Sequence, residues 1–358
     1  MMEAATGSGI SLEELQLAAR NHGMPLEALR HAITPAGLHY LLIHFDVPVV
    51  DAATWRLEVD GEVERPLSLS LDELRRRPAV ERTVTMECAG NGRALLDPRP
   101  VSQPWLAEAI GTAMWRGVDL RSLLDEAGIR TDAVEILFTA LDRGIDGGIP
   151  QAYQRSLRTD EPALDDAVLA YEMNDAPLPP QHGFPLRLVV PGWYGMTSVK
   201  WLTQITAAVQ PFAGYQQVDA YRFRRDEADP GVPVTRILPR ALLAPPGVPD
   251  FFTRERSVPL GPVALEGRAW SGLAPVERVE VSADGGETWW DATLEDDLGS
   301  PWAWCRWNAE WRPSGAGSYV LSCRVTDAAG NLQPLEPVWN VGGYANNAVQ
   351  RVAVTVAH

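Results

Sequence analysis

Cys88 lies in the stretch TVTMECAGNGR (83–93), whose residue types suit a metal site. The residues before it favour a β-strand, and the Ala-Gly-Asn-Gly that follows has almost no side-chain bulk. We therefore expect a strand to end at the sulfur, where the backbone allows a close approach. A thiolate is a soft ligand that suits a redox-active metal. The alternative is a small buried core residue, because free cysteine is among the most buried residue types.

A second polar cluster lies in QHGFPLRLVVPGWYGMTSVKW (181–201). It contains His182, Arg187 and Lys200, which is the only lysine in the chain. Basic side chains beside small residues suit a phosphate-bearing ligand. Taken singly, His182 can cap a turn and Lys200 can be solvated. The sequence contains neither GxGxxG nor GxxxxGK[ST], so the usual nucleotide-binding loops are absent.

The composition limits the classes of partner. The 358 residues are enough for two or three domains, and 46% hydrophobic with 22% charged residues is typical of a globular protein. A formal net charge of −16 argues against nucleic acid or an anionic membrane as a partner. No apolar run is long enough to span a membrane, and residues 1–24 lack a signal-peptide pattern, so we expect a cytoplasmic protein. No two of the three cysteines form a CxxC pair, which argues against a zinc site or a disulfide framework.

The elements that must position these residues follow an α+β order. Residues 1–37 read as a helical segment, with a capping box at SLEE (11–14) and a second short helix from Pro25. Residues 38–240 mix both element types. The predicted strands there are 55–63, 134–142 and 184–192, and the predicted helices are 70–80 and 117–129.

The pattern changes after about residue 240. LLAPPGVPD (242–250) reads as a proline-rich linker, and 276–294 reads as a hairpin with its turn at Asp-Gly-Gly (284–286). Alternation in 318–334 places Cys323 on an apolar strand face, where we expect core packing, and 351–356 reads as a last strand. These short strands predict an immunoglobulin-like β-sandwich over 245–358, of about 110 residues.

Four segments resemble one known family. MECAGNGR (86–93) resembles the cysteine loop of the sulfite oxidase family of molybdenum enzymes, and AYEMNDAPLPPQHGFPLRLVVPGWYGMTSVKW (170–201) resembles its molybdopterin-binding segment. Residues 276–289 and 338–354 resemble the C-terminal dimerisation domain of the same family. The resemblance extends over about 38–358. It implies a sulfite-oxidase-type mixed α/β molybdopterin domain, followed by an immunoglobulin-like domain that forms a homodimer.

The resemblance assigns roles to individual residues. Cys88 matches the thiolate that binds molybdenum, and Tyr221 matches a tyrosine whose hydroxyl points at the metal-bound oxygens. Arg93 and Trp105 match members of the substrate pocket. The positions that match residues holding the pterin and its phosphate are His44, Asp142, His182, Arg187, Ser198 and Lys200.

Departures from the family pattern concern the anion-binding half of the site. Leu42 and Gly342 stand where the family has arginines, and its double arginine after CAGN is reduced to Gly92-Arg93. Arg224 and Arg225, close to Tyr221, are candidates to restore the charge. Neither HPGG nor CxxCH occurs, so we expect no haem and a separate electron acceptor.

The implied function is that of a molybdenum-cofactor-dependent oxidoreductase that transfers an oxygen atom. The resemblance favours oxidation of sulfite with water to sulfate, with two electrons passed to an external acceptor. A first alternative is reduction of a less charged oxo-substrate, such as a sulfoxide, since two expected arginines are missing. A second alternative is a cofactor-free binding protein in which the sandwich is an interaction module and Cys88 a buried thiol.

Overall fold

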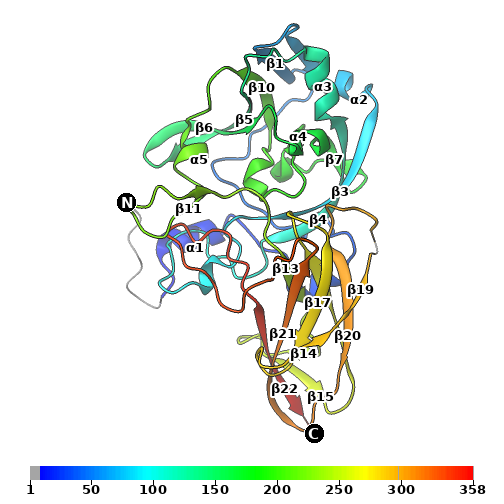
Figure 1. Cartoon of the computed structure of the whole chain (residues 1–358). Coiled ribbons are helices and arrows are strands. Elements are labelled where there is room, and N and C mark those ends of the chain that lie inside the picture. The colour runs from blue at the N-terminus through cyan, green and yellow to red at the C-terminus, as the bar shows by residue number, and fades with distance from the viewer. Residues whose placement is uncertain (1–8, 297, 358) are drawn as a thin grey trace.

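A computed structural model describes residues 9–296 and 298–357 and has an N-terminal mixed part and a C-terminal sandwich (Figure 1). The helices are α1 Leu12–Ala18, α2 Leu71–Arg75, α3 Leu120–Ala127, α4 Ala163–Asp166 and α5 Tyr215–Val218, and the 3-10 helices are η1 Leu26–Arg30, η2 Arg93–Leu95, η3 Pro180–His182 and η4 Gly195–Thr197. The predicted capping box at Ser11 is confirmed, and Ser70 with Glu73 forms a second one at the start of α2. No helix in the described ranges is both long and apolar enough to cross a membrane.

Two sheets form the N-terminal domain. The first has the strand order β2-β1-β10-β5-β6, with β1 Arg56–Gly61, β2 Leu67–Ser70, β5 Glu135–Asp146, β6 Ile149–Arg158 and β10 Leu202–Ala208. The second contains β3 Ala79–Glu87, β4 Ile110–Asp119, β7 Val168–Met173, β8 Ala176–Pro177 and β9 Arg187–Val189, which pairs with β7. A two-stranded ribbon of β11 Arg222–Phe223 and β12 Val232–Pro233 follows. A core cluster of buried residues from both sheets and α3 fixes their relative positions.

The C-terminal domain is the predicted β-sandwich. One sheet consists of β13 Arg240–Leu243, β16 Val263–Trp270, β19 Thr293–Glu295 and β20 Cys305–Trp311. The other consists of β14 Val248–Pro249, β15 Arg256–Pro259, β17 Val276–Ser282, β18 Trp290–Asp291, β21 Gly317–Asp327 and β22 Gln350–Ala357. Cys323 is fully buried in the core between these sheets, as its strand face predicts.

Several predicted boundaries are wrong by a few residues. The helix predicted to begin at 117 begins at Leu120, because β4 continues through Asp119 and pairs with β7. The strand predicted over 184–192 is limited to β9, since Pro185 and Pro191 cannot donate to a strand ladder. The stretch predicted as a linker at 242–250 contributes to β13 and β14, so the sandwich begins at Arg240.

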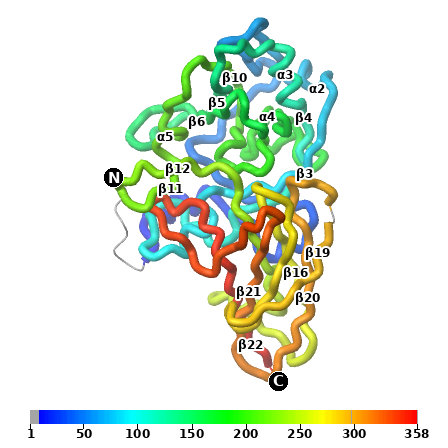
Figure 2. The backbone as a smooth tube through the Cα atoms, in the orientation of Figure 1, coloured from blue at the N-terminus to red at the C-terminus, as the bar shows by residue number. Residues whose placement is uncertain are grey.

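One loop of the sandwich returns to the N-terminal domain. The segment between β21 and β22, orange to red in Figure 2, extends upward to the level of β11. The Ala345 amide there donates to the Ala89 carbonyl over 2.7 Å, and the Asn346 side chain donates to the Gly92 carbonyl over 2.7 Å. The C-terminal domain therefore supports the loop that carries Cys88.

Candidate active site

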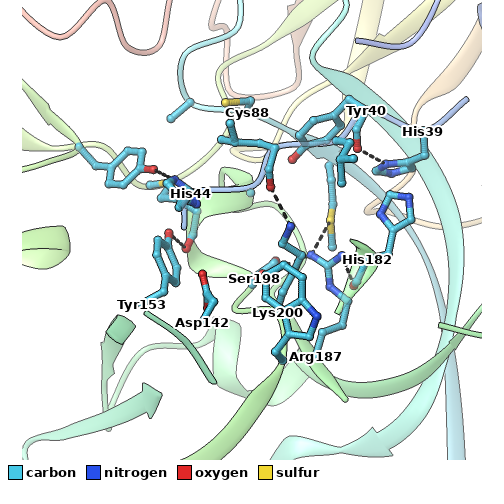
Figure 3. Close-up of a pocket in the computed structure, with 18 residues that line it drawn as sticks. His39, Tyr40, His44, Cys88, Asp142, Tyr153, His182, Arg187, Ser198 and Lys200 are labelled. Carbon is cyan, nitrogen blue, oxygen red and sulfur yellow. Dashed lines mark hydrogen bonds between the residues drawn. The ribbon is translucent and has the colours of Figure 1, made fainter. Parts of the chain in front are cut away.

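A cavity lies between the two sheets of the N-terminal domain and the loop after β3 (Figure 3). Eight of the ten predicted site residues line it: His44, Cys88, Asp142, His182, Arg187, Ser198, Lys200 and Tyr221. In Figure 3, Cys88 lies at the top, His44, Asp142 and Tyr153 lie on one side, and the basic residues lie on the other. Residues that are far apart in sequence thus converge on one space.

Cys88 follows directly on the last residue of β3, as the sequence predicts. Its amide donates to the Ala109 carbonyl over 2.9 Å, and its side chain is buried. Burial raises the pKa of the thiol, while the Arg93 charge and the Gly90 amide act in the opposite direction. At position 90, a Cβ atom would lie 2.7 Å from the Arg93 guanidinium, so a larger residue there would have to displace that charge.

Arg187 is a buried cation on the basic side of the cavity. Its two terminal nitrogens donate to the carbonyls of His182 and Ser198 over 3.1 and 3.2 Å. The guanidinium also lies 4.7 Å from the centre of the Trp115 ring. Burial lowers its pKa to about 10, and its Nε has no hydrogen-bond partner in the described part of the chain. One donor is therefore left for a ligand.

Lys200 lies beside Arg187 and has no carboxylate ion pair in residues 9–296 and 298–357. Its ammonium donates to the carbonyls of Leu42 and Gln181 over 2.7 and 3.2 Å. Burial, with a smaller contribution from Arg187, lowers its pKa to about 7, and nearby Asp142 opposes this. Two neighbouring cations with little counter-charge make this side of the cavity suitable for an anion such as a phosphate.

Two uncharged imidazoles and one carboxyl group surround the same space. Burial lowers the pKa of His182 far below its ordinary value and that of His39 to about 4, so both rings are neutral at pH 7. Their ring centres are 5.5 Å apart, and His39 Nε2 has no partner among the described residues. Burial raises the pKa of Asp142 to about 6, which makes it a donor or acceptor near neutral pH. Such groups suit a polar heterocycle.

Tyr221 and His44 form a hydrogen-bonded pair on the other side. The phenol oxygen lies 2.5 Å from His44 Nε2, and the imidazole stacks on the Tyr153 ring at 4.6 Å. Burial raises the pKa of Tyr221 well above its ordinary value and lowers that of His44 to about 3. The phenol therefore keeps its proton and shares a hydrogen bond with the neutral imidazole, in which the His44 tautomer sets the donor. Tyr221 has a φ of +52°, so its backbone is held in the left-handed region.

Ser198, Trp105 and Arg93 have more structural contacts than the prediction implies. The Ser198 hydroxyl accepts from the Val190 amide over 3.1 Å, although it lines the cavity. Trp105 packs in the same buried cluster as Cys88 without lining the cavity. Arg93 lies behind the wall, where its Nε donates to the Gly342 carbonyl over 2.9 Å. Their assigned roles stay predictions.

His39, Tyr40, Met86 and Tyr153 also line the cavity and were not identified from the sequence. His39 and Tyr40 directly precede the segment that contains His44, so proximity in sequence is a signal for them. Tyr153 donates to the Met196 carbonyl over 2.7 Å and lies in β6, a strand that the sequence analysis left unassigned. Only the pairing of β6 with β5 brings it to the cavity.

The residues present fit a molybdopterin cofactor. A soft thiol, two cations with little counter-charge and unpaired buried nitrogens of Arg187 and His39 share one cavity. A phosphate-bearing heterocycle that holds a thiophilic metal would satisfy each of these groups. Within the described residues, no cluster of three or more His, Cys, Asp or Glu side chains is arranged to hold a metal ion.

Two family models match the chain. Residues 44–216 match the oxidoreductase molybdopterin binding domain, and residues 253–357 match the Mo-co oxidoreductase dimerisation domain. The second match supports a homodimer formed through the C-terminal domain.

Similar proteins agree with both matches. Sulfite oxidase of Gallus gallus is 38% identical over 338 residues, which cover 89% of this chain and 72% of that protein. Nitrate reductase [NADH] of Solanum lycopersicum is 33% identical over 366 residues, and the chain spans only 40% of its length. The crystal structure of the sulfane dehydrogenase SoxCD from Paracoccus pantotrophus matches with a TM-score of 0.80 and 25% identity, covering 100% of this chain and 90% of that one.

Proposed function

The chain belongs to the sulfite oxidase family of molybdopterin-dependent oxidoreductases, and on that premise we propose that it oxidises sulfite in the cavity below Cys88. The observation that carries the proposal is the convergence of the Cys88 thiol with Arg187 and Lys200 on one buried space. In the reaction, sulfite and water give sulfate, two protons and two electrons. We propose that a separate protein or small molecule accepts the electrons.

The chain's own residues would bind and orient the cofactor. Cys88 would bind the metal as a thiolate, while Arg187 and Lys200 would neutralise the phosphate. His182 and Asp142 would form hydrogen bonds with the pterin. The bound molybdenum cofactor supplies two-electron oxygen-atom transfer, which no protein side chain provides.

Tyr221, oriented by His44, would donate a hydrogen bond to the reacting oxygen. The phenol keeps its proton at all ordinary pH values and is held by His44 at 2.5 Å. It thus always carries a proton to donate in a hydrogen bond. The hydroxyl can rotate from the imidazole toward an oxygen in the cavity without a change in charge. Burial keeps His44 neutral, so the imidazole does not take up a proton of its own. The pair therefore orients the phenol proton of Tyr221.

A less charged oxo-substrate, such as a sulfoxide that is reduced, is the second candidate. Leu42 lines the cavity and packs against the apolar cluster around Cys88, where the family has an arginine. At the other departure, the Gly342 carbonyl accepts from Arg93. At both positions the cavity therefore lacks an arginine charge that would bind a dianion.

Metal analysis and steady-state kinetics test the proposal. Protein produced in a host that makes molybdopterin should contain close to one molybdenum per chain and should oxidise sulfite with ferricyanide as acceptor. Leu42→Arg should lower the KM for sulfite, whereas Val49→Arg, at a fully exposed position on the same loop, should leave it unchanged. Metal-loaded protein that reduces a sulfoxide but does not oxidise sulfite would favour the second candidate. Repeated absence of molybdenum would exclude both.

A further inference from the structure

We propose that Arg155 is a specificity-determining residue that recognises an anionic substrate and takes over from the arginines missing at positions 42 and 342. The inference rests on the proposed function, since it concerns the substrate side of the same cavity. Arg155 lies in β6, and neither its sequence context nor the family resemblance identified it.

Arg155 is a buried cation without a carboxylate partner. Only 4% of the residue is exposed, and it forms no ion pair with any carboxylate in the described part of the chain. One terminal nitrogen donates to the Gln216 carbonyl, and Nε has no partner. A buried guanidinium with an unsatisfied donor is costly, and a bound anion would offset that cost.

The direction of the side chain places this charge beside the cavity. Arg155 and Tyr153 are two positions apart in one strand, so their side chains share a face of the sheet. Tyr153 lines the cavity. The Arg155 guanidinium carbon lies 5.7 Å from the centre of the ring of Tyr221, which also lines the cavity.

Arg155 has a counterpart on the side of the C-terminal domain. The Arg93 guanidinium carbon lies 5.0 Å from the centre of the Tyr344 ring. The rings of Tyr344 and Tyr221 are in turn 5.2 Å apart. Two guanidinium groups therefore flank a pair of phenol rings next to Cys88, and neither forms an ion pair among the described residues. The family resemblance assigned a role to Arg93 but none to Arg155 or Tyr344.

The cation pair that lines the cavity and the pair behind its wall would have different tasks. Arg187 and Lys200 lie on the side where His182 and Asp142 suit the pterin and its phosphate. Arg93 and Arg155 do not line the cavity themselves; they lie behind Tyr344 and Tyr221, and an anion that reached them would bind on this side. An anion there would be attracted strongly, because a charge in a low-dielectric interior is screened little by water.

The two arginines suggested by the sequence do not supply this charge. Arg224 donates to the Asp219 carbonyl over 3.1 Å, and Arg225 is exposed on the loop that leads to β12. A bound anion would have to draw them out of these positions. Arg155, in contrast, is buried and keeps its Nε without a partner among the described residues.

Three variants and one control test the proposal in the holoenzyme. Arg155→Met removes the charge, Arg155→Gln removes it but keeps a donor for the Gln216 carbonyl, and Arg155→Lys keeps it. Arg158→Met is the control, because Arg158 lies in the same strand on the opposite face, with its side chain 73% exposed and paired with Asp160. Each variant is first checked for molybdenum content and melting temperature. If Arg155→Met does not fold, the comparison of Arg155→Gln with wild type tests the proposal.

The measurements are KM and kcat for sulfite, the inhibition constant for sulfate, and sulfate binding by calorimetry. Loss of the charge should raise KM and the sulfate inhibition constant at least tenfold, with kcat changed less than threefold at full metal content. Arg155→Lys should stay within about threefold of wild type in KM, and the control should match wild type. Unchanged KM and sulfate inhibition in a metal-loaded neutral variant would overturn the proposal.

The calorimetric experiment separates this inference from the proposed function. If wild-type holoenzyme does not oxidise sulfite, the function proposal fails, but sulfate binding still tests Arg155. Binding by the wild type that is lost in the neutral variant would support an anion site. Equal binding by both, or none by the wild type, would refute it.

Discussion

Removal of the Arg240 side chain should destabilise the loop that presents Cys88. The Glu87 carboxylate, which directly precedes Cys88, is 1% exposed and forms an ion pair with Arg240 Nε at 2.9 Å. It also accepts from the Trp270 indole over 2.8 Å and from the Asn91 side chain over 3.1 Å. Arg240 and Trp270 belong to the sandwich, so this cluster joins the two domains directly behind the cysteine.

The expected size of the effect follows from burial. Removing one partner of a buried ion pair leaves an uncompensated charge, which costs about 3–5 kcal/mol. For a chain of this length that corresponds to a fall in melting temperature of about 4–7 °C. Arg312→Met is the matched control, because it breaks an exposed pair with Glu310, at 70% and 56% side-chain exposure. That change should cost about 0–1 kcal/mol.

A double variant tests whether the uncompensated Glu87 charge causes the loss of stability. Glu87→Gln together with Arg240→Met removes both charges and keeps an acceptor for the Trp270 indole. We expect it to recover at least half of the stability lost in Arg240→Met, and to bind more molybdenum than the single variant. The assay is thermal unfolding of cofactor-free protein, with molybdenum content measured on separately loaded samples. A loss of less than about 1 kcal/mol in Arg240→Met, or a double variant with additive losses, would refute the reasoning.

Four further predictions follow from the site and the sandwich. Cys88→Ser should abolish molybdenum-dependent activity, whereas Cys323→Ser in the sandwich core should lower stability but keep the metal, as metal analysis will show. Tyr221→Phe removes the hydrogen bond to His44 and should lower kcat with cofactor content unchanged; an equal kcat would contradict its role. Because the pKa of Lys200 is about 7 when folded and 10.5 ordinarily, it stabilises cofactor-free protein above pH 10.5, and this contribution is lost as pH falls toward 7. Lys200→Met should remove that slope in denaturation midpoints from pH 7 to 10.5. Light scattering should give twice the 39.2 kDa chain mass, and a single-chain mass at micromolar concentration would count against the homodimer.

Local patterns were sufficient for the elements that depend on neighbours in sequence. The capped helix α2, the end of β3 at Cys88 and the buried face of β21 follow from side-chain types within a few positions. Errors occurred where pairing with distant strands decides the outcome. β4 extends to Asp119 only because β7 lies beside it, and the proline-rich stretch 242–250 is part of the sandwich because β13 pairs with β16.

The same distinction holds for the site. Residues within long motifs, such as His182 and Lys200, were placed correctly at the cavity because the whole segment resembles one family. Tyr153 and Arg155 lie in a strand with no motif, and only the fold of β6 against β5 directs them inward. Residue type alone cannot separate Arg155 from exposed Arg158, because both are arginines in the same strand.

The departure from the family pattern at Gly342 has a structural consequence beyond the loss of one arginine. With glycine at position 342, its carbonyl accepts from Arg93, and Tyr344 covers the guanidinium. An arginine at position 342 would place a side chain against Tyr344, since a Cβ there would already lie 2.3 Å from its ring. An arginine at this position would therefore require the Tyr344 ring to move. The chain has one arrangement, with positive charge on Arg93 and Arg155 behind two tyrosines, so substrate charge must be judged from this arrangement and not from the missing arginines.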